Sequence, residues 1–354
     1  MAQQHLDPTD PTTRAVPVSG DALAGYLRAQ ATEFLRSLRQ HRETGGGGAP
    51  TRASSSLAEN GSAGSVDAAR ALRRSARRIS GSLHTFRPLL DPDWSERMRP
   101  ELAWLSGTLA REHAYSARLE RLIGALNRLS GTGFPTQAGP EPSTTSKGSL
   151  TIGAAKAGAL LDRQLTLART RAHSAALQAL GSSRFHAVAD SVAVLASEVP
   201  LTPAAATADL RPSAAAAESR LLDAVGPLPL LTAGHPYNAE ALVHGLSADT
   251  APQPQDAPWH QVRLLLRLHR YAREVLYGEE CPVDVRLLGA GQALNRHRDA
   301  AEAASAAASA ARTPRIAPAT AYALGVLHAD QRHEVEAARF AFQQSWQKEA
   351  VPTP

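Results

Sequence analysis

Two segments of this chain carry basic side chains at a spacing that suits the binding of an anion. Each has three of them at positions i, i+3 and i+7, namely Arg70, Arg73 and Arg77 in the first and His260, Arg263 and Arg267 in the second. Because an α-helix turns by about 100° per residue, each trio lies on one face of a helix. Arginine suits phosphate well, since its planar guanidinium can donate to two oxygens at once. The spacing therefore predicts two helices that each present a phosphate-binding row.

Neighbouring residues extend both rows. Arg74 joins the first row and Arg78 flanks it, while Arg270, Tyr271 and Glu274 fall close to the line of the second. Like charges on one helix face repel each other by a few tenths of a kcal/mol per pair, so each row opposes folding unless something neutralises it. A polyanion would neutralise both rows. The hydroxyl of Tyr271 either donates to phosphate or faces solvent at the edge of the core, and the sequence leaves both open.

The alternative explanation is a solvated basic surface whose partners lie on other helices. The candidate carboxylates are Glu101, Glu112, Glu120 and Asp299. The net charge of +5 and the sequence pI of about 9.7 agree with either explanation. Only three of the 38 Lys and Arg residues are lysine, and a bias of the genome toward GC-rich codons would also produce this skew.

The rest of the sequence predicts an all-α fold. Ala and Leu dominate the apolar residues, aromatic residues make up only 5% of the chain, and no segment has convincing strand character. Apolar periodicity predicts helices over residues 18–39, 66–84, 94–129, 151–180, 183–199, 214–225, 259–277, 283–312 and 317–349. Polar, Gly-rich and Pro-rich composition predicts a disordered tail over 1–17, a flexible insert over 43–65 and a linker over 130–149. That linker separates a first half, about 18–129, from a second half, about 150–349.

Several classes of protein are disfavoured by what the sequence lacks. Cys281 is the single cysteine, so neither an intramolecular disulfide nor a cysteine-based zinc site is expected. No apolar run is long enough to span a membrane and no hydrophobic signal core is present, which predicts a cytoplasmic protein. Histidines and acidic residues have neither metal-ligand nor nucleophile–base spacing. We therefore expect no catalytic residue, no metal site and no cofactor.

The two basic helices begin units that resemble each other. Each is followed by a partner helix with a matching segment, LAREHA at 109–114 in the first half and LNRHRD at 294–299 in the second. Two copies of one helical hairpin would build a duplicated bundle with approximate two-fold symmetry. Such symmetry would bring the two basic rows close together.

These segments resemble the signatures of the CHAD domain, a helical domain named for its conserved histidines. The stretch ARALRRSARRISGSLHTFRPLLDP is similar to the first signature, and WHQVRLLLRLHRYAREV is similar to the second. Arg298–Asp299 matches the family's RD motif, and the resemblance extends over about residues 18–348. The chain departs from the family in its first half, where Arg70 replaces the histidine and His113–Ala114 replaces the RD motif. These departures remove an imidazole but keep the positive charge.

The resemblance implies two pseudo-symmetric four-helix bundles around a basic central cavity. It also implies non-catalytic binding of inorganic polyphosphate, with localisation at polyphosphate granules. The residues expected to bind it are Arg70, Arg73, Arg74, Arg77, Arg78, His260, Arg263, Arg267, Arg270 and Tyr271. A phosphohydrolase acting on polyphosphate or triphosphate, and a non-specific nucleic-acid-binding protein, stay open as alternatives. Specific nucleic-acid binding is not expected, because no recognition motif and few aromatic stacking residues are present. The sequence predicts no oligomeric state.

Overall fold

The structure is a computed structural model of the chain. It describes residues 19–45, 55–131, 144–235, 246 and 253–348. Those ranges contain ten α-helices, several short 3-10 turns and no strand, which confirms the all-α prediction. The expected tail, over 1–17, lies outside the described residues, as do 46–54 of the expected insert and 132–143 of the expected linker.

Most helices agree with the predicted segments. They are α1 (Gly20–Gly45), α2 (Ser55–Thr85), α3 (Pro92–Leu129), α4 (Thr144–Leu180), α5 (Ser183–Ser197), α6 (Arg211–Val225), α7 (Leu230–Ala233), α9 (Ala257–Tyr277), α10 (Val285–Ala311) and α11 (Pro318–Trp346). Two of them begin earlier than expected. α2 begins inside the predicted insert and α4 inside the predicted linker, because a Ser-rich or Thr-rich stretch next to a strong helix can extend that helix.

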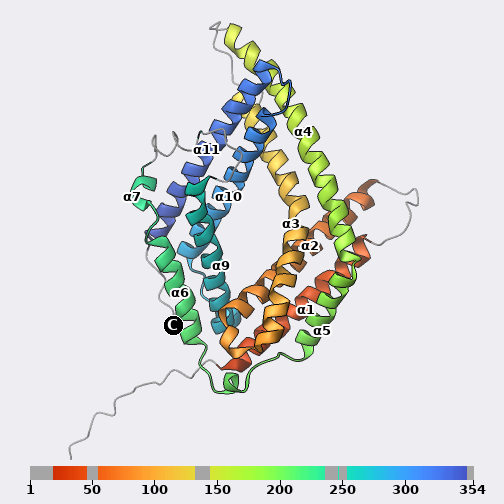
Figure 1. Cartoon of the computed structure of the whole chain (residues 1–354), viewed down its shortest axis with the longest axis vertical. Coiled ribbons are helices and arrows are strands. Elements are labelled where there is room, and N and C mark those ends of the chain that lie inside the picture. The colour runs from red at the N-terminus through yellow and green to blue at the C-terminus, as the bar shows by residue number, and fades with distance from the viewer. Residues whose placement is uncertain (1–18, 46–54, 132–143, 236–245, 247–252, 349–354) are drawn as a thin grey trace, which may run out of the picture.

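The helices are arranged as a ring in which α3 and α4 face α10 and α11 (Figure 1). Their buried apolar residues form three cores. One joins α1, α2, α5 and the first half of α3, and includes Phe34 and Phe86. A second lies where the C-terminal parts of α3 and α10 meet the N-terminal parts of α4 and α11. It is rich in alanine, with Ala303 and Ala307 as examples. The third surrounds Trp259 and joins α6, α9, α10 and the end of α11.

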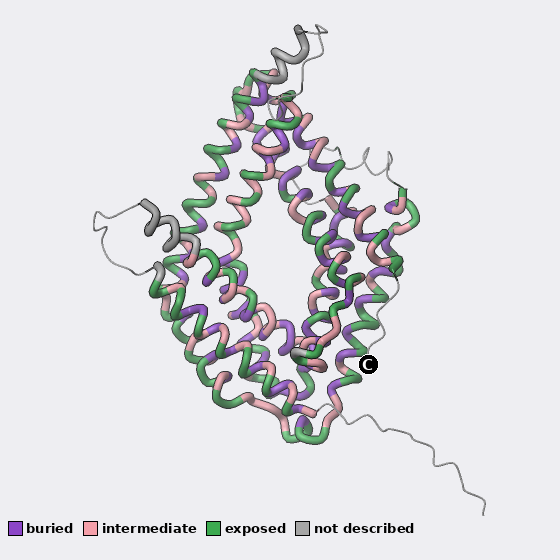
Figure 2. Tube along the Cα trace, turned by 180° about the vertical axis from the view of Figure 1, so that it is seen from behind, coloured by how far each residue is buried: buried purple, intermediate pink, exposed green. Residues whose placement is uncertain are grey.

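Buried, intermediate and exposed residues alternate along every helix of the ring, as amphipathic helices require (Figure 2). None of the helices in the described ranges is both long and apolar enough to cross a membrane. The approximate two-fold symmetry and the pair of four-helix bundles that we expected stay predictions.

Polar contacts fix the helix that carries the second basic row. The carboxylate of Asp284 caps α10 by accepting from the backbone N–H groups of Arg286 and Leu287 at 2.9 and 3.1 Å. The same carboxylate accepts from Nη1 of buried Arg273 on α9 at 3.2 Å. One side chain thus sets both the start of α10 and its position against α9.

A basic cavity as the candidate functional site

The two predicted rows face one cavity. α2 packs against α9, and the approach is close at Gly81, where a Cβ atom would lie 2.6 Å from Cδ2 of Tyr271. Beside this contact is a cavity of about 450 Å³ between α2, α3, α9 and α10. Its lining includes four arginines of the two rows and Tyr271, namely Arg73, Arg77, Arg263, Arg267 and Tyr271. Two helices far apart in the sequence therefore turn their guanidinium groups toward the same space.

These four guanidinium groups repel one another. Burial, and after it the charge of Arg73, lower the pKa of Arg77 to about 10. Burial, and after it the charges of Arg267 and Arg298, likewise lower the pKa of Arg263 to about 10. The pKa values of Arg73 and Arg267 are shifted in the same direction, with burial again the largest cause. All four remain cationic at neutral pH, so the lining of the cavity holds closely spaced positive charge.

No carboxylate lies within ion-pair distance of these four arginines in the part of the chain that the structure describes, although the charges of Asp299 and Glu302 act on Arg263 from farther away. None of them takes part in an ion pair there, and the Nε atoms of Arg73, Arg77 and Arg263 are buried without a hydrogen-bond partner. A weak polar contact is made by Arg263, whose Nη1 donates to Oδ1 of Asn295 at 3.4 Å. Buried cationic donors without partners are costly, which leaves this cavity suited to an anion.

The carboxylates suggested as alternative partners bind other groups. Glu101 accepts from Arg184 at 2.7 Å, and Glu112 lies 2.9 Å from His173. Asp299 accepts from Arg298 at 2.9 Å. Glu120 lines a different cavity, between α1, α2, α3 and α4, which Arg73 and Glu112 also line, but it forms no ion pair with Arg73. Among the described residues, these carboxylates form no ion pair with the four arginines. The alternative explanation, a solvated basic surface paired by carboxylates of other helices, therefore does not account for these arginines.

Other predicted residues lie outside this cavity. Arg74 and Arg270 are exposed. Arg70 is also exposed, donates to Asp67 at 3.1 Å, and approaches the ring of His113 to within 3.4 Å. His260 is half-buried and lines a neighbouring cavity on α10.

Arg78 is already neutralised. It donates to Glu274 through Nε at 2.7 Å and through Nη2 at 3.3 Å. The hydroxyl of Tyr26 on α1 donates to the same carboxylate at 2.9 Å. Arg78 therefore ties α2 to α9 and α1, and it has fewer free donors than the four arginines of the cavity.

Sequence reasoning missed a third source of positive charge. Arg298 of α10 lines the first cavity and also a second one of about 480 Å³, which borders α3. The basic residues of this second cavity are Arg73, Arg111, His113, Arg118, Arg121 and Arg298. The signals were present: Arg298 belongs to the RD motif, and Arg111 and Arg118 are seven residues apart on α3, the spacing that identified the first two rows.

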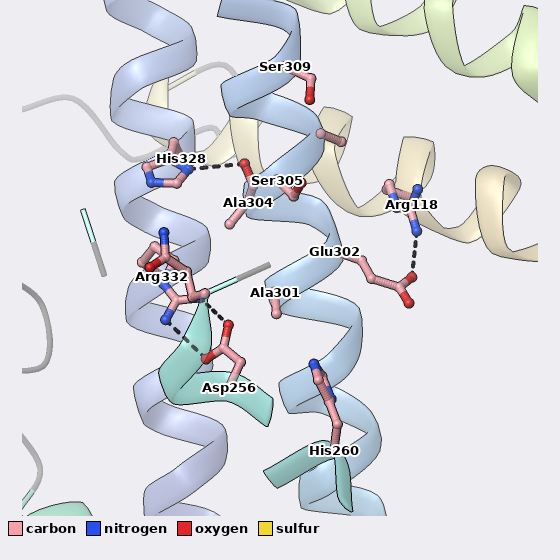
Figure 3. Close-up of a pocket in the computed structure, with 12 residues that line it drawn as sticks. Arg118, Asp256, His260, Ala301, Glu302, Ala304, Ser305, Ser309, His328 and Arg332 are labelled. Carbon is pink, nitrogen blue, oxygen red and sulfur yellow. Dashed lines mark hydrogen bonds and ion pairs between the residues drawn. The ribbon is translucent and has the colours of Figure 1, made fainter. Parts of the chain in front are cut away.

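A third cavity, of about 450 Å³, lies between α10 and α11 and is lined by mixed charges (Figure 3). Arg332 donates to both carboxylate oxygens of buried Asp256, at 2.8 and 3.2 Å. Burial on its own would raise the pKa of Asp256, but the neighbouring His297 and the hydrogen bonds and charge of Arg332 together outweigh it and lower the pKa. Nδ1 of His328 lies 3.0 Å from the carbonyl oxygen of Ala304. This cavity is close to neutral, unlike the first.

The described residues contain no group of three or more His, Cys, Asp or Glu side chains that could hold a metal ion. The geometry instead brings guanidinium groups of α2, α9 and α10 to the lining of one cavity. Such an arrangement can bind a polyanion by several charge-assisted hydrogen bonds.

Comparisons with known proteins confirm the family resemblance of the sequence. The CHAD domain matches residues 52–308 of the chain. Among solved structures, PptA from Streptomyces chartreusis is 70% identical in sequence; the alignment covers 94% of this chain and 100% of that one, with a TM-score of 0.75. A search of curated proteins found no match.

Proposed function

Because this chain belongs to the CHAD domain family, we propose that it binds inorganic polyphosphate in the cavity between α2 and α9. The contacts would come from Arg73, Arg77, Arg263 and Arg267, with Arg298 beside them and the hydroxyl of Tyr271 as a further donor. The exposed Arg74 and Arg270 would add long-range attraction, and His260 would meet the chain where it leaves this cavity. The observation that carries the proposal is that none of the four arginines has an ion-pair partner among the described residues.

The chemistry of polyphosphate fits this lining. A linear polyphosphate carries roughly one negative charge per phosphate, and hydrogen bonds between charged partners contribute about 1.5–3 kcal/mol each. Several arginines on opposed helices can engage successive phosphates at once, so a chain gains more from the cavity than a single phosphate does. Binding by such contacts weakens as salt rises, as it does for other polyanions.

We propose a binding role and not a catalytic one. The charged groups that line the α2–α9 cavity are cations, and among the described residues no carboxylate joins that lining to act as a general base or metal ligand. Localisation at polyphosphate granules would follow from tight binding to long chains. Release of phosphate from polyphosphate by the purified protein with Mg²⁺ would contradict the non-catalytic role.

The direct test reverses charge inside the cavity. Arg263→Glu combined with Arg267→Glu should lower affinity for long polyphosphate at least about 100-fold, since two charge-assisted bonds of 1.5 kcal/mol or more are lost and repulsion is added. Titration calorimetry measures the affinity, and far-UV circular dichroism should show unchanged helicity.

The matched control makes the same charge change on exposed residues of α4, Arg163→Glu with Arg171→Glu. This control should bind nearly as well as the parent protein. Unchanged affinity of the cavity variant at moderate salt would overturn the assignment of the site. Competition separates the nucleic-acid alternative: polyphosphate should displace DNA, while DNA should not displace long polyphosphate.

A further inference from the structure

The two adjoining basic cavities differ in one respect. Both are lined by Arg73 and Arg298, so they meet at these residues. The cavity between α2 and α9, here the open section, has no carboxylate in its lining. The cavity that borders α3, here the guarded section, is lined by the carboxylates of Asp299 and Glu302 as well as by arginines.

Glu302 already binds one arginine of the guarded section and lies near a second. It extends from α10 toward α3, where Nη2 of Arg118 donates to its Oε2 at 2.5 Å (Figure 3). Its other oxygen, Oε1, lies 3.9 Å from Nε of Arg298. The side chain of Arg118 is 17% exposed and that of Glu302 is 43% exposed. The arginine is thus fixed in the cavity wall, while the glutamate can turn away into solvent.

A phosphate entering the guarded section must compete with Glu302 for Arg118. A free short anion competes only at its concentration in solution. A long chain anchored in the open section delivers its next phosphates across Arg73 and Arg298 at a high effective concentration, of order millimolar for a short flexible connection. The same ion pair therefore opposes short anions more strongly than long ones.

We propose that Glu302 is a specificity-determining residue, which keeps short phosphate anions out of the guarded section and leaves that section to long polyphosphate chains. This inference rests on the proposed function of the open section. Glu302 acts by holding Arg118 until a chain anchored in the open section displaces it. The carboxylate then turns to solvent, and Arg118 donates to phosphate.

The test compares tripolyphosphate with long-chain polyphosphate by titration calorimetry. The parent protein should bind one tripolyphosphate, in the open section. Glu302→Gln should bind a second one, with affinity for it raised about tenfold or more, because Arg118 becomes free to form one charge-assisted bond. Affinity for long chains should change less, so the preference for long over short chains falls.

Two further variants make the result specific. Glu101→Gln makes the same change of charge at an ion pair outside both sections, with Arg184, and should leave tripolyphosphate stoichiometry unchanged. Arg118→Gln should weaken long-chain binding, leave the first tripolyphosphate site intact, and abolish any effect of Glu302→Gln in the double variant. Equal stoichiometry and affinity for tripolyphosphate in Glu302→Gln and Glu101→Gln would overturn the inference.

Failure of the proposed function gives a different result. In that case the parent protein binds neither ligand. If the parent binds long polyphosphate but Glu302→Gln changes nothing, only the role of Glu302 is wrong. In the Arg263→Glu, Arg267→Glu background, Glu302→Gln should still gain a tripolyphosphate site, because the guarded section is intact there.

Discussion

Adjacent arginines on one helix have different roles here. Arg77 faces the cavity without a carboxylate, whereas Arg78 is held by Glu274 and Tyr26. Burial lowers the pKa of Arg78, but the hydrogen bond to Glu274, the charge of Glu274 and the smaller effects of Tyr26 and Tyr271 together outweigh this and raise the pKa overall. The pKa of Tyr26 is also raised, by burial first and by Glu274 next. We therefore assign Arg78 to holding the two rows in place.

Glu274→Gln should test this assignment through stability. The two side chains of the pair are only 29% and 22% exposed, so loss of the charge leaves a partly buried guanidinium with one weaker acceptor. We expect the free energy of unfolding to fall by about 1–3 kcal/mol, measured by urea denaturation. The control is Glu33→Gln, whose pair with Arg36 is exposed and should contribute less than about 1 kcal/mol. An equal loss of unfolding free energy in the two variants would contradict the assignment of the Arg78–Glu274 pair to holding the two rows in place.

The sequence could predict part of the site at this scale. Spacing alone brought Arg73, Arg77, Arg263 and Arg267 onto two faces, and the structure turns these faces toward one cavity. It could not separate Arg78 from its neighbours, because the helical wheel does not show which helix supplies a carboxylate. That depends on how α9 and α1 pack against α2, which is a tertiary property.

At the scale of elements, the distance between the rows depends on how closely α2 approaches α9. Gly81 permits this approach, since any side chain there would meet the ring of Tyr271. The centre of this ring lies 5.8 Å from Cζ of the Arg78 guanidinium. A small residue on one helix and a large one on the other thus fix the spacing of the cavity walls.

Gly81→Ala should force α2 and α9 apart. A Cβ at 2.6 Å from Cδ2 of Tyr271 cannot be accommodated without a shift, and overpacking of this kind costs about 1–3 kcal/mol. Thermal unfolding should show the loss, and affinity for polyphosphate should fall with it. Gly124→Ala on α3 is the control, because its Cβ would meet nothing within 4 Å and alanine favours the helix by up to about 1 kcal/mol. A neutral or stabilising effect of Gly81→Ala would contradict the close-packing argument.

Helix positions were largely predictable, while some helix starts were not. Periodic apolar residues fix the middle of each helix, and Asp284 and Asp91 supply recognisable caps for α10 and α3. α2 and α4 extend into Ser-rich or Thr-rich stretches that lack a periodic apolar pattern. Local composition favoured a loop there, but each of these long helices continues through it.

At the scale of the whole molecule, a buried ionic network anchors the helix that carries the second row. Asp256, just before α9, accepts from Arg332 and from Arg339 of α11, the latter at 2.6 Å. Nε of Arg339 also donates to Nε2 of His297 on α10 at 3.3 Å. The network therefore joins the start of α9 to α10 and α11, and Asp256 and Arg332 of this network line the third cavity. Sequence reasoning did not find it, because arginines within an alanine-rich helix look like surface residues.

His297 should make the stability of the fold depend on pH. It is 1% exposed, and its Nε2 accepts from Arg339, which requires a neutral ring. Burial, with the charge of Arg339 acting in the same direction, outweighs the raising effect of the neighbouring Asp256 and lowers the pKa of His297 to about 4, whereas an unfolded histidine titrates near 6.5.

Between these two values the unfolded chain binds a proton that the folded chain does not, so stability must fall as pH drops from about 6.5 toward 4. His297 alone should account for about 3 kcal/mol of this loss. Urea denaturation at pH 7.5 and pH 4.5 measures the loss in the parent protein and in His297→Gln. The variant should start less stable, lose less on acidification, and approach the parent at pH 4.5. If both proteins lose the same amount between the two pH values, His297 does not stay neutral in the folded network.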